Sequence, residues 1–235
     1  MLILEPLFSL IYLIIIGTIF TRMAMQYRHQ PITQHGANHW LLMGVLVLGM
    51  GDLFHLGARA FQTLTDFGSP SWRMASTLVG WGLFATSFTL TLFYLFALVY
   101  LWKKEGRVRG WLDWSIAAAL SARLLVLFYP QNNWGGTATE WSLYRNIPFF
   151  IGGLGVALLF LHTAQTTTSP IRRWYAGVGW AMVASFVCYL GALLLADRYP
   201  LVYALMGVKS IAYIIITFSF YKLESQNHET SCIHV

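Results

Sequence analysis

The chain has 235 residues, of which 57% are hydrophobic and only 10% are charged. A soluble domain usually carries about 25% charged residues, and one water-soluble core of this length cannot hide so much apolar surface. The composition therefore excludes an ordinary soluble domain and predicts an all-α, polytopic membrane protein. The net charge is +6, and we expect lipid rather than nucleic acid as the partner of such a chain.

Seven apolar windows each have the length of about 20 residues that a membrane-spanning helix requires. They cover residues 6–22, 40–61, 75–101, 112–129, 142–164, 175–196 and 200–221. Turn and helix-breaking residues separate them, among them Pro31, Gly68-Ser69-Pro70 and Pro130. The sequence predicts a seven-transmembrane-helix bundle over residues 1–223, followed by a short cytoplasmic tail over residues 224–235.

Lysine and arginine residues are distributed unevenly between the two ends of the predicted spans. Nine lie on the side that holds the C-terminal tail: Arg22, Arg28, Lys103, Lys104, Arg107, Arg109, Arg172, Arg173 and Lys222. Only Arg73 and Arg198 lie on the other side. Because cytoplasmic loops are enriched in Lys and Arg, we expect the N-terminus outside and the C-terminus in the cytoplasm. The expected location is a bacterial plasma membrane, which the chain crosses several times.

Six ionisable residues remain inside the predicted spans: Asp52, His55, Arg59, Arg123, Arg145 and Lys209. A charge at the bilayer centre costs about 2.5–3.5 kcal/mol on insertion scales, so such groups face a partner or a wet cavity. All six lie in the outer half of the membrane. Asp52 and Lys209 both lie nine residues from the outer ends of their spans, which is about 13 Å deep at 1.5 Å per residue.

These charges predict a binding site. The spacing of Asp52, His55 and Arg59 (i, i+3, i+7) places them on one face of the second span, and the matching depth makes Lys209 the expected ion-pair partner of Asp52. The remaining arginines leave an excess of positive charge. We therefore expect an outward-facing pocket, built from all six residues, that binds a small anionic or lipid-like ligand in a transporter or receptor.

Asn146 and Pro148 predict a break in the fifth span near Arg145. Irregular backbone at membrane depth is tolerated where it lines a cavity, so the break is consistent with a pocket. Three acidic residues near the rim of this pocket are candidate counter-charges: Glu5, Glu140 and Asp197.

The stretch GDLFHLGAR, residues 51–59, resembles a G-D-x-F-H-L-x-x-R motif of uncharacterised bacterial seven-helix membrane proteins. The resemblance covers one helix and implies no particular activity. The topology and Lys209 in the seventh span are similar to those of microbial rhodopsins, in which a lysine of that helix forms the retinal Schiff base. That resemblance implies retinal as cofactor and Asp52 as counter-ion, although the third span lacks a carboxylate and Leu205 stands where the family has a polar residue. Otherwise we expect no cofactor.

An Asp and a His in a seven-helix bundle also resemble the membrane hydrolases related to alkaline ceramidase, which bind zinc through several histidines. Only His55 lies at a suitable depth, and a catalytic zinc site uses three protein ligands, so we expect no metal. A metal-free enzyme acting on lipid is the alternative, with His55 as general base oriented by Asp52. The sequence leaves four functions open: a binding protein, an enzyme, a retinal protein and a passive assembly partner. It also leaves the oligomeric state open.

Overall fold

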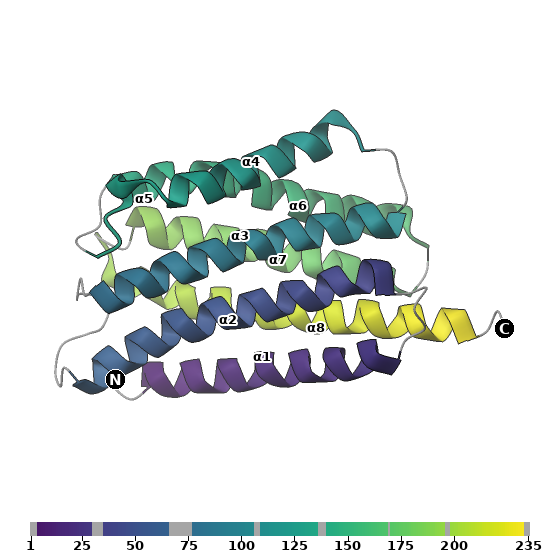
Figure 1. The fold of residues 1–235 in the computed structure, drawn as a ribbon, viewed down its shortest axis with the longest axis horizontal. Helices are drawn as coiled ribbons and strands as arrows, with labels where there is room; N and C mark the ends of the chain where they lie inside the picture. Colours follow the sequence, from purple (N-terminus) through teal and green to yellow (C-terminus); the bar gives the residue numbers. More distant parts are fainter. Residues whose placement is uncertain are drawn as a thin grey trace.

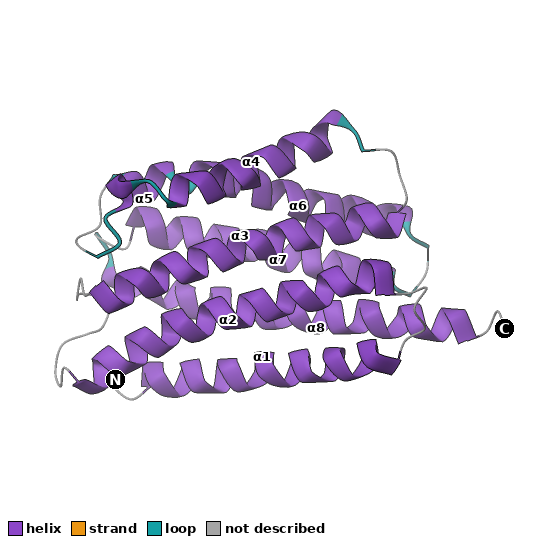
Figure 2. Ribbon diagram, in the orientation of Figure 1, coloured by secondary structure: helices purple, strands orange, loops and turns teal. Residues whose placement is uncertain are grey.

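The structure is a computed structural model that describes residues 4–29, 35–65, 77–105, 109–135, 140–168, 170–195 and 198–232. Throughout these ranges the regular structure is helical, without strands (Figure 2), which confirms the all-α prediction for them. The long helices are α1 (Leu4–His29), α2 (His35–Thr65), α3 (Thr77–Glu105), α4 (Trp111–Leu127), α6 (Ile147–Thr166), α7 (Arg172–Leu195) and α8 (Leu205–Cys232). The short helices are η3 (Pro130–Asn132), α5 (Trp141–Tyr144) and η4 (Pro200–Ala204).

Six segments of the described chain are long and apolar enough to cross a membrane, namely α1, α2, α3, α7, α8 and the combined segment Trp141–Thr166. Large apolar side chains cover their outer surfaces. Phe54, Leu158 and Val187, for example, are each more than half exposed. Such surfaces are unfavourable in water and suit contact with lipid, so the architecture indicates a multi-pass membrane protein.

The helices run roughly along one long axis and form a closed bundle (Figure 1). Each long helix packs against its neighbour in the chain, and α1 packs against α8. Helix α3 also packs against α6. The N-terminus and α5 lie at one end of the bundle, which we call the N-terminal end, and the C-terminus lies at the opposite end (Figure 1).

Two glycines bring α2 and α3 into close contact. A Cβ atom at Gly51 would lie 1.7 Å from Oγ1 of Thr89, and one at Gly82 would lie 3.1 Å from Cα of His55. Only glycine leaves room for this approach, because small residues let helix backbones touch in membrane bundles. The contact places Asp52, which follows Gly51, opposite Thr86 on α3.

The predicted break in the fifth span is confirmed, because α5 ends at Tyr144 and α6 begins at Ile147. The side chain of Asn146 donates a 2.6 Å hydrogen bond to the carbonyl of Ser142 at this point. The predicted tail over residues 224–235 is in large part helical, because α8 continues through Cys232. Once a helix is nucleated, each added residue contributes a backbone hydrogen bond, so polar residues prolong it beyond the apolar window.

Most of the basic residues lie toward the end opposite the N-terminal end. They are Arg22, Arg28, Lys103, Lys104, Arg109, Arg172, Arg173 and Lys222. Arg107 and Arg73, which also belong to the predicted uneven distribution of basic residues, lie outside the described residues.

Candidate functional site

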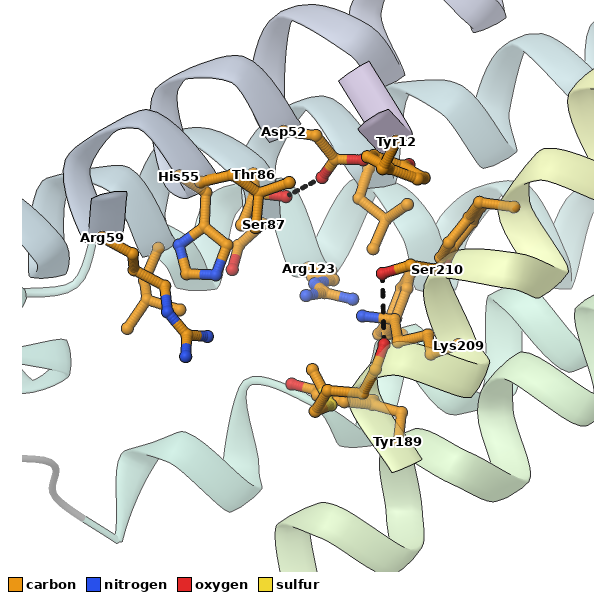
Figure 3. A pocket seen from close by; sticks show the side chains of 16 residues that line it. Tyr12, Asp52, His55, Arg59, Thr86, Ser87, Arg123, Tyr189, Lys209 and Ser210 are labelled. Carbon is orange, nitrogen blue, oxygen red and sulfur yellow. Dashed lines mark hydrogen bonds between the residues drawn. The ribbon is translucent and has the colours of Figure 1, made fainter. Parts of the chain in front are cut away.

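A cavity of about 120 Å³ lies inside the bundle toward its N-terminal end, and each of the seven long helices contributes to its wall (Figure 3). We call it the charged cavity. Its polar lining residues are Tyr12, Asp52, His55, Arg59, Thr86, Ser87, Arg123, Tyr189, Lys209, Ser210 and Tyr213. An engineered apolar cavity of about 150 Å³ holds a benzene-sized molecule. The charged cavity is therefore large enough for a small polar ligand.

Five of the six ionisable residues singled out in the sequence line this cavity. They are Asp52, His55, Arg59, Arg123 and Lys209. They come from three helices, α2, α4 and α8, that are far apart in the chain. Arg145 is not among the lining residues.

Asp52 is held by two hydroxyl groups. Tyr12 of α1 donates a 2.5 Å hydrogen bond to Oδ2, and Thr86 of α3 donates one of 3.1 Å to Oδ1. Lys209 interacts electrostatically with Asp52, but the expected ion pair between them is absent from the described structure. The reason is the packing of α2, which lies mainly between α1 and α3 and so meets their hydroxyl groups first.

Arg123 is 2% exposed, and its Nε and Nη1 atoms have no hydrogen-bond partner. Its Cζ atom lies 3.4 Å from the centroid of the Phe149 ring. Among the described residues, no carboxylate pairs with it. A desolvated cation–π contact contributes about 2 kcal/mol, whereas burying an ion costs several kcal/mol. The ring therefore compensates only part of the cost of the buried charge.

Lys209 is the second cation without a carboxylate partner in the described part of the chain. Its Nζ atom lies 4.6 Å from the centroid of the Tyr189 ring and 5.7 Å from that of Tyr213. The nitrogen ends of Arg123 and Lys209 point into the same hollow (Figure 3), and the two charges interact electrostatically. Two like charges facing one space favour an anion between them.

His55 lies beside Asp52 on α2, but the two side chains do not hydrogen-bond to each other. The Nδ1 atom of His55 is buried without a hydrogen-bond partner. In Asp52, Oδ2 accepts a hydrogen bond from Tyr12 and Oδ1 accepts one from Thr86. The expected orientation of a His55 base by Asp52 is therefore not present. His55 keeps a nitrogen that is able to bind a ligand or move a proton.

Arg145 was expected to line the pocket, but it contacts residues outside the charged cavity instead. It donates a 3.3 Å hydrogen bond to Oδ1 of Asn132, and its Cζ lies 4.2 Å from the centroid of the Trp134 ring. Trp134 in turn donates to the carbonyl of Leu127, at the end of α4. The depth of Arg145 in its span therefore did not predict the direction of its side chain.

Several residues of the cavity were not predicted from the sequence, in particular Tyr12, Phe149, Tyr189 and Tyr213. Tyrosines in the middle of a span carry a polar group to membrane depth, which was an available signal. Thr86 belongs to a Thr/Ser series in the third span that is typical of ordinary helix packing.

Of the three acids expected near the rim, only Glu140 has a described side chain. Glu140 is exposed, whereas Asp197 and the side chain of Glu5 lie outside the described residues. Within the described ranges, no three His, Cys, Asp or Glu side chains come together to hold a metal ion.

Comparison with known proteins adds no relative. No protein-family model matches the chain, and no curated protein or solved structure matches it.

Proposed function

We propose that the protein is a seven-span membrane protein of a bacterial plasma membrane that binds a small anionic or lipid-derived ligand in the charged cavity, as a transporter or receptor. Six spans are the six long apolar segments. Helix α4 is the proposed seventh. Its 17 residues span about 25 Å at 1.5 Å per residue, near the lower limit of transmembrane helices, and it packs against α3 and α6.

We propose that the charged cavity faces the outside of the cell. The cavity lies toward the N-terminal end of the bundle. Outside the cavity, eight described basic residues lie toward the opposite end, and two, Arg145 and Arg198, lie near the N-terminal end. The positive-inside rule assigns the basic end to the cytoplasm. A ligand would then enter from the outer side.

The observation that carries the proposal is the state of Arg123. A 2% exposed guanidinium with two unpartnered nitrogens lines a cavity together with the unpaired ammonium of Lys209. Buried charges are normally paired, because an unpaired one loses its hydration without compensation. An anion in the cavity would supply charge-assisted hydrogen bonds to both groups.

Thermal unfolding of the detergent-purified protein with a panel of small anions tests this proposal. The reference buffer contains gluconate, which is bulky, as its only anion. We expect at least one anion to raise the midpoint by several degrees, because saturation at 100 times Kd contributes about 2.7 kcal/mol. Arg123→Gln should lose this response, whereas the control Arg173→Gln, which changes an exposed arginine at the opposite end, should keep it. Equal responses of wild type and Arg123→Gln to every anion would contradict the proposal.

One observation favours the enzyme as second candidate, namely the unpartnered Nδ1 of His55 at the cavity wall. A free imidazole nitrogen is able to act as a general base on a bound lipid. Incubation with phospholipids and lysolipids separates the two functions. Turnover that is lost in His55→Gln and kept in the exposed-site control His162→Gln would support the enzyme, and binding without turnover would support the transporter or receptor.

A further inference from the structure

We infer that the ligand of the charged cavity is a small monocarboxylate, an anion with one carboxylate group and a short apolar stem. The inference rests on the proposed function, since it names the chemical class of the anion. It follows from the way Arg123 lies on Phe149, from the charges that face the cavity and from the apolar part of the cavity lining.

Phe149 fixes the direction from which a ligand can bond to Arg123. The Cζ atom lies 3.4 Å from the centroid of the ring, and each guanidinium nitrogen lies about 1.3 Å from Cζ, as in a peptide bond. An upright guanidinium would press a nitrogen into the ring, so the group lies flat on it. Its N–H bonds then point sideways, past the edge of the ring. Two parallel N–H donors in one plane match the two oxygens of a carboxylate.

The charges that face the cavity, with His55 taken as neutral, leave one positive charge without a counter-charge. Lys209 and Asp52 carry opposite charges and interact electrostatically, so together they sum to zero. Arg123 remains, and its Nε and Nη1 atoms have no hydrogen-bond partner. Arg59 also lines the cavity but has interactions of its own, so its charge is not part of this excess. A singly charged anion balances Arg123, whereas a doubly charged one would add a buried negative charge.

Apolar side chains form the rest of the cavity wall. Besides Phe149, they are Leu56, Leu83, Leu90 and Met206. Chloride and sulfate have no apolar part that could contact these side chains, whereas the stem of a carboxylic acid does. The cavity volume of about 120 Å³ is slightly below the volume of about 150 Å³ that holds benzene. It therefore suits an anion of about five or six non-hydrogen atoms, such as propionate or butyrate.

Calorimetry with the full-length protein in detergent micelles, at equal ionic strength in gluconate buffer, tests the inference. Competition by gluconate lowers all apparent affinities by the same factor and leaves their ratios unchanged. We expect propionate to bind about fourfold more tightly than acetate, the factor for one buried methylene group. It should bind at least about tenfold more tightly than its neutral isostere propionamide and than chloride, sulfate or phosphate. The tetrahedral anions should still bind weakly, because they also accept hydrogen bonds from an arginine.

Arg123→Lys separates geometry from charge. The lysine keeps the positive charge but lacks the two parallel donors, so the preference for propionate over chloride should fall at least about tenfold. The control Arg173→Lys, at the opposite end of the bundle, should keep the wild-type preference. Met206→Ala enlarges the cavity and should shift the tightest-binding acid toward longer chains, such as valerate.

A fatty acid carries the same carboxylate group, and a lipid arm separates the two sources. Competition of oleate in nanodiscs with propionate supports the head end of a fatty acid, whereas no competition supports a free short-chain acid. Wild-type protein that binds chloride or sulfate as tightly as propionate would overturn this inference and leave the anion site standing. Propionamide that binds as tightly as propionate, or binding of no anion at all, would overturn the proposed function as well.

Discussion

The Cζ atom of Arg123 on α4 lies 3.4 Å from the centroid of the Phe149 ring on α6. Two glycines of α6 allow α4 to approach closely enough for this contact. A Cβ atom at Gly152 would lie 2.6 Å from Cγ of Leu120, and one at Gly155 would lie 2.5 Å from Cγ1 of Ile116. The ring stabilises the cation but accepts no hydrogen bond from its N–H groups. The guanidinium therefore keeps hydrogen-bond donors for a ligand.

Arg123→Met should leave the anion-free protein at least as stable as wild type. A buried ion exchanged for an apolar side chain of similar volume is neutral or stabilising, by about 1–4 kcal/mol. Equilibrium unfolding in mixed detergent micelles, with gluconate as the only anion, measures the change. Arg173→Met is the control and should change the free energy of unfolding by less than about 1 kcal/mol. A loss of 3 kcal/mol or more, about the cost of breaking a buried ion pair, would show that Arg123 has a structural partner.

Tyr12→Phe should destabilise the protein by about 1.5–3 kcal/mol, the contribution of a hydrogen bond to a charged group. The 2.5 Å bond from Tyr12 to Asp52 joins α1 to α2, and its loss leaves one carboxylate oxygen without that donor. The same unfolding experiment measures the effect. Tyr144→Phe, at a side chain that is 52% exposed, serves as control with an expected change under about 0.5 kcal/mol. Equal small effects of the two substitutions would argue against the Tyr12–Asp52 contact.

Gly51→Ala should destabilise the bundle by about 1–3 kcal/mol through overpacking. The new Cβ would lie 1.7 Å from Oγ1 of Thr89 and 3.1 Å from Cα of Thr86, so α2 and α3 would have to separate. Gly57→Ala on the same helix meets nothing within 4 Å and should stabilise it by about 0.5–1 kcal/mol. Opposite signs in a thermal unfolding experiment are expected, and a neutral Gly51→Ala would contradict the close helix contact.

Arg145→Gln should affect stability rather than ligand binding. Arg145 contacts Asn132 and Trp134 outside the charged cavity, and these contacts are together worth about 1–2 kcal/mol. Arg145 does not line the cavity and only interacts electrostatically with Arg123, so Kd should change less than about threefold. Calorimetry with the anion identified in the panel measures this. A loss of affinity comparable with that of Arg123→Gln would return Arg145 to the binding site.

The sequence was sufficient to predict the long helices and most of the charged residues that line the cavity, because both depend on position along a helix axis. Apolar length identifies the spans, and counting residues from their ends gives the depth of each charge. Asp52 and Lys209 were expected at one depth and Arg123 in the same half of the membrane, and the structure places all three around one cavity.

What the sequence could not predict was direction around the axis. Depth alone paired Asp52 with Lys209, but neighbouring helices bring Tyr12 and Thr86 closer to Asp52. Arg145 was assigned to the pocket from its depth alone, but its side chain contacts Asn132 and Trp134. Both differences depend on packing between helices, which a single apolar pattern does not encode.

The most direct test of an anion between Arg123 and Lys209 is an anomalous difference map from crystals soaked in arsenate, a heavier analogue of phosphate. We expect a peak in the charged cavity within hydrogen-bond distance of both the Arg123 guanidinium and the Lys209 ammonium. A cavity without a peak, with Arg123 paired to a carboxylate of the protein, would contradict it.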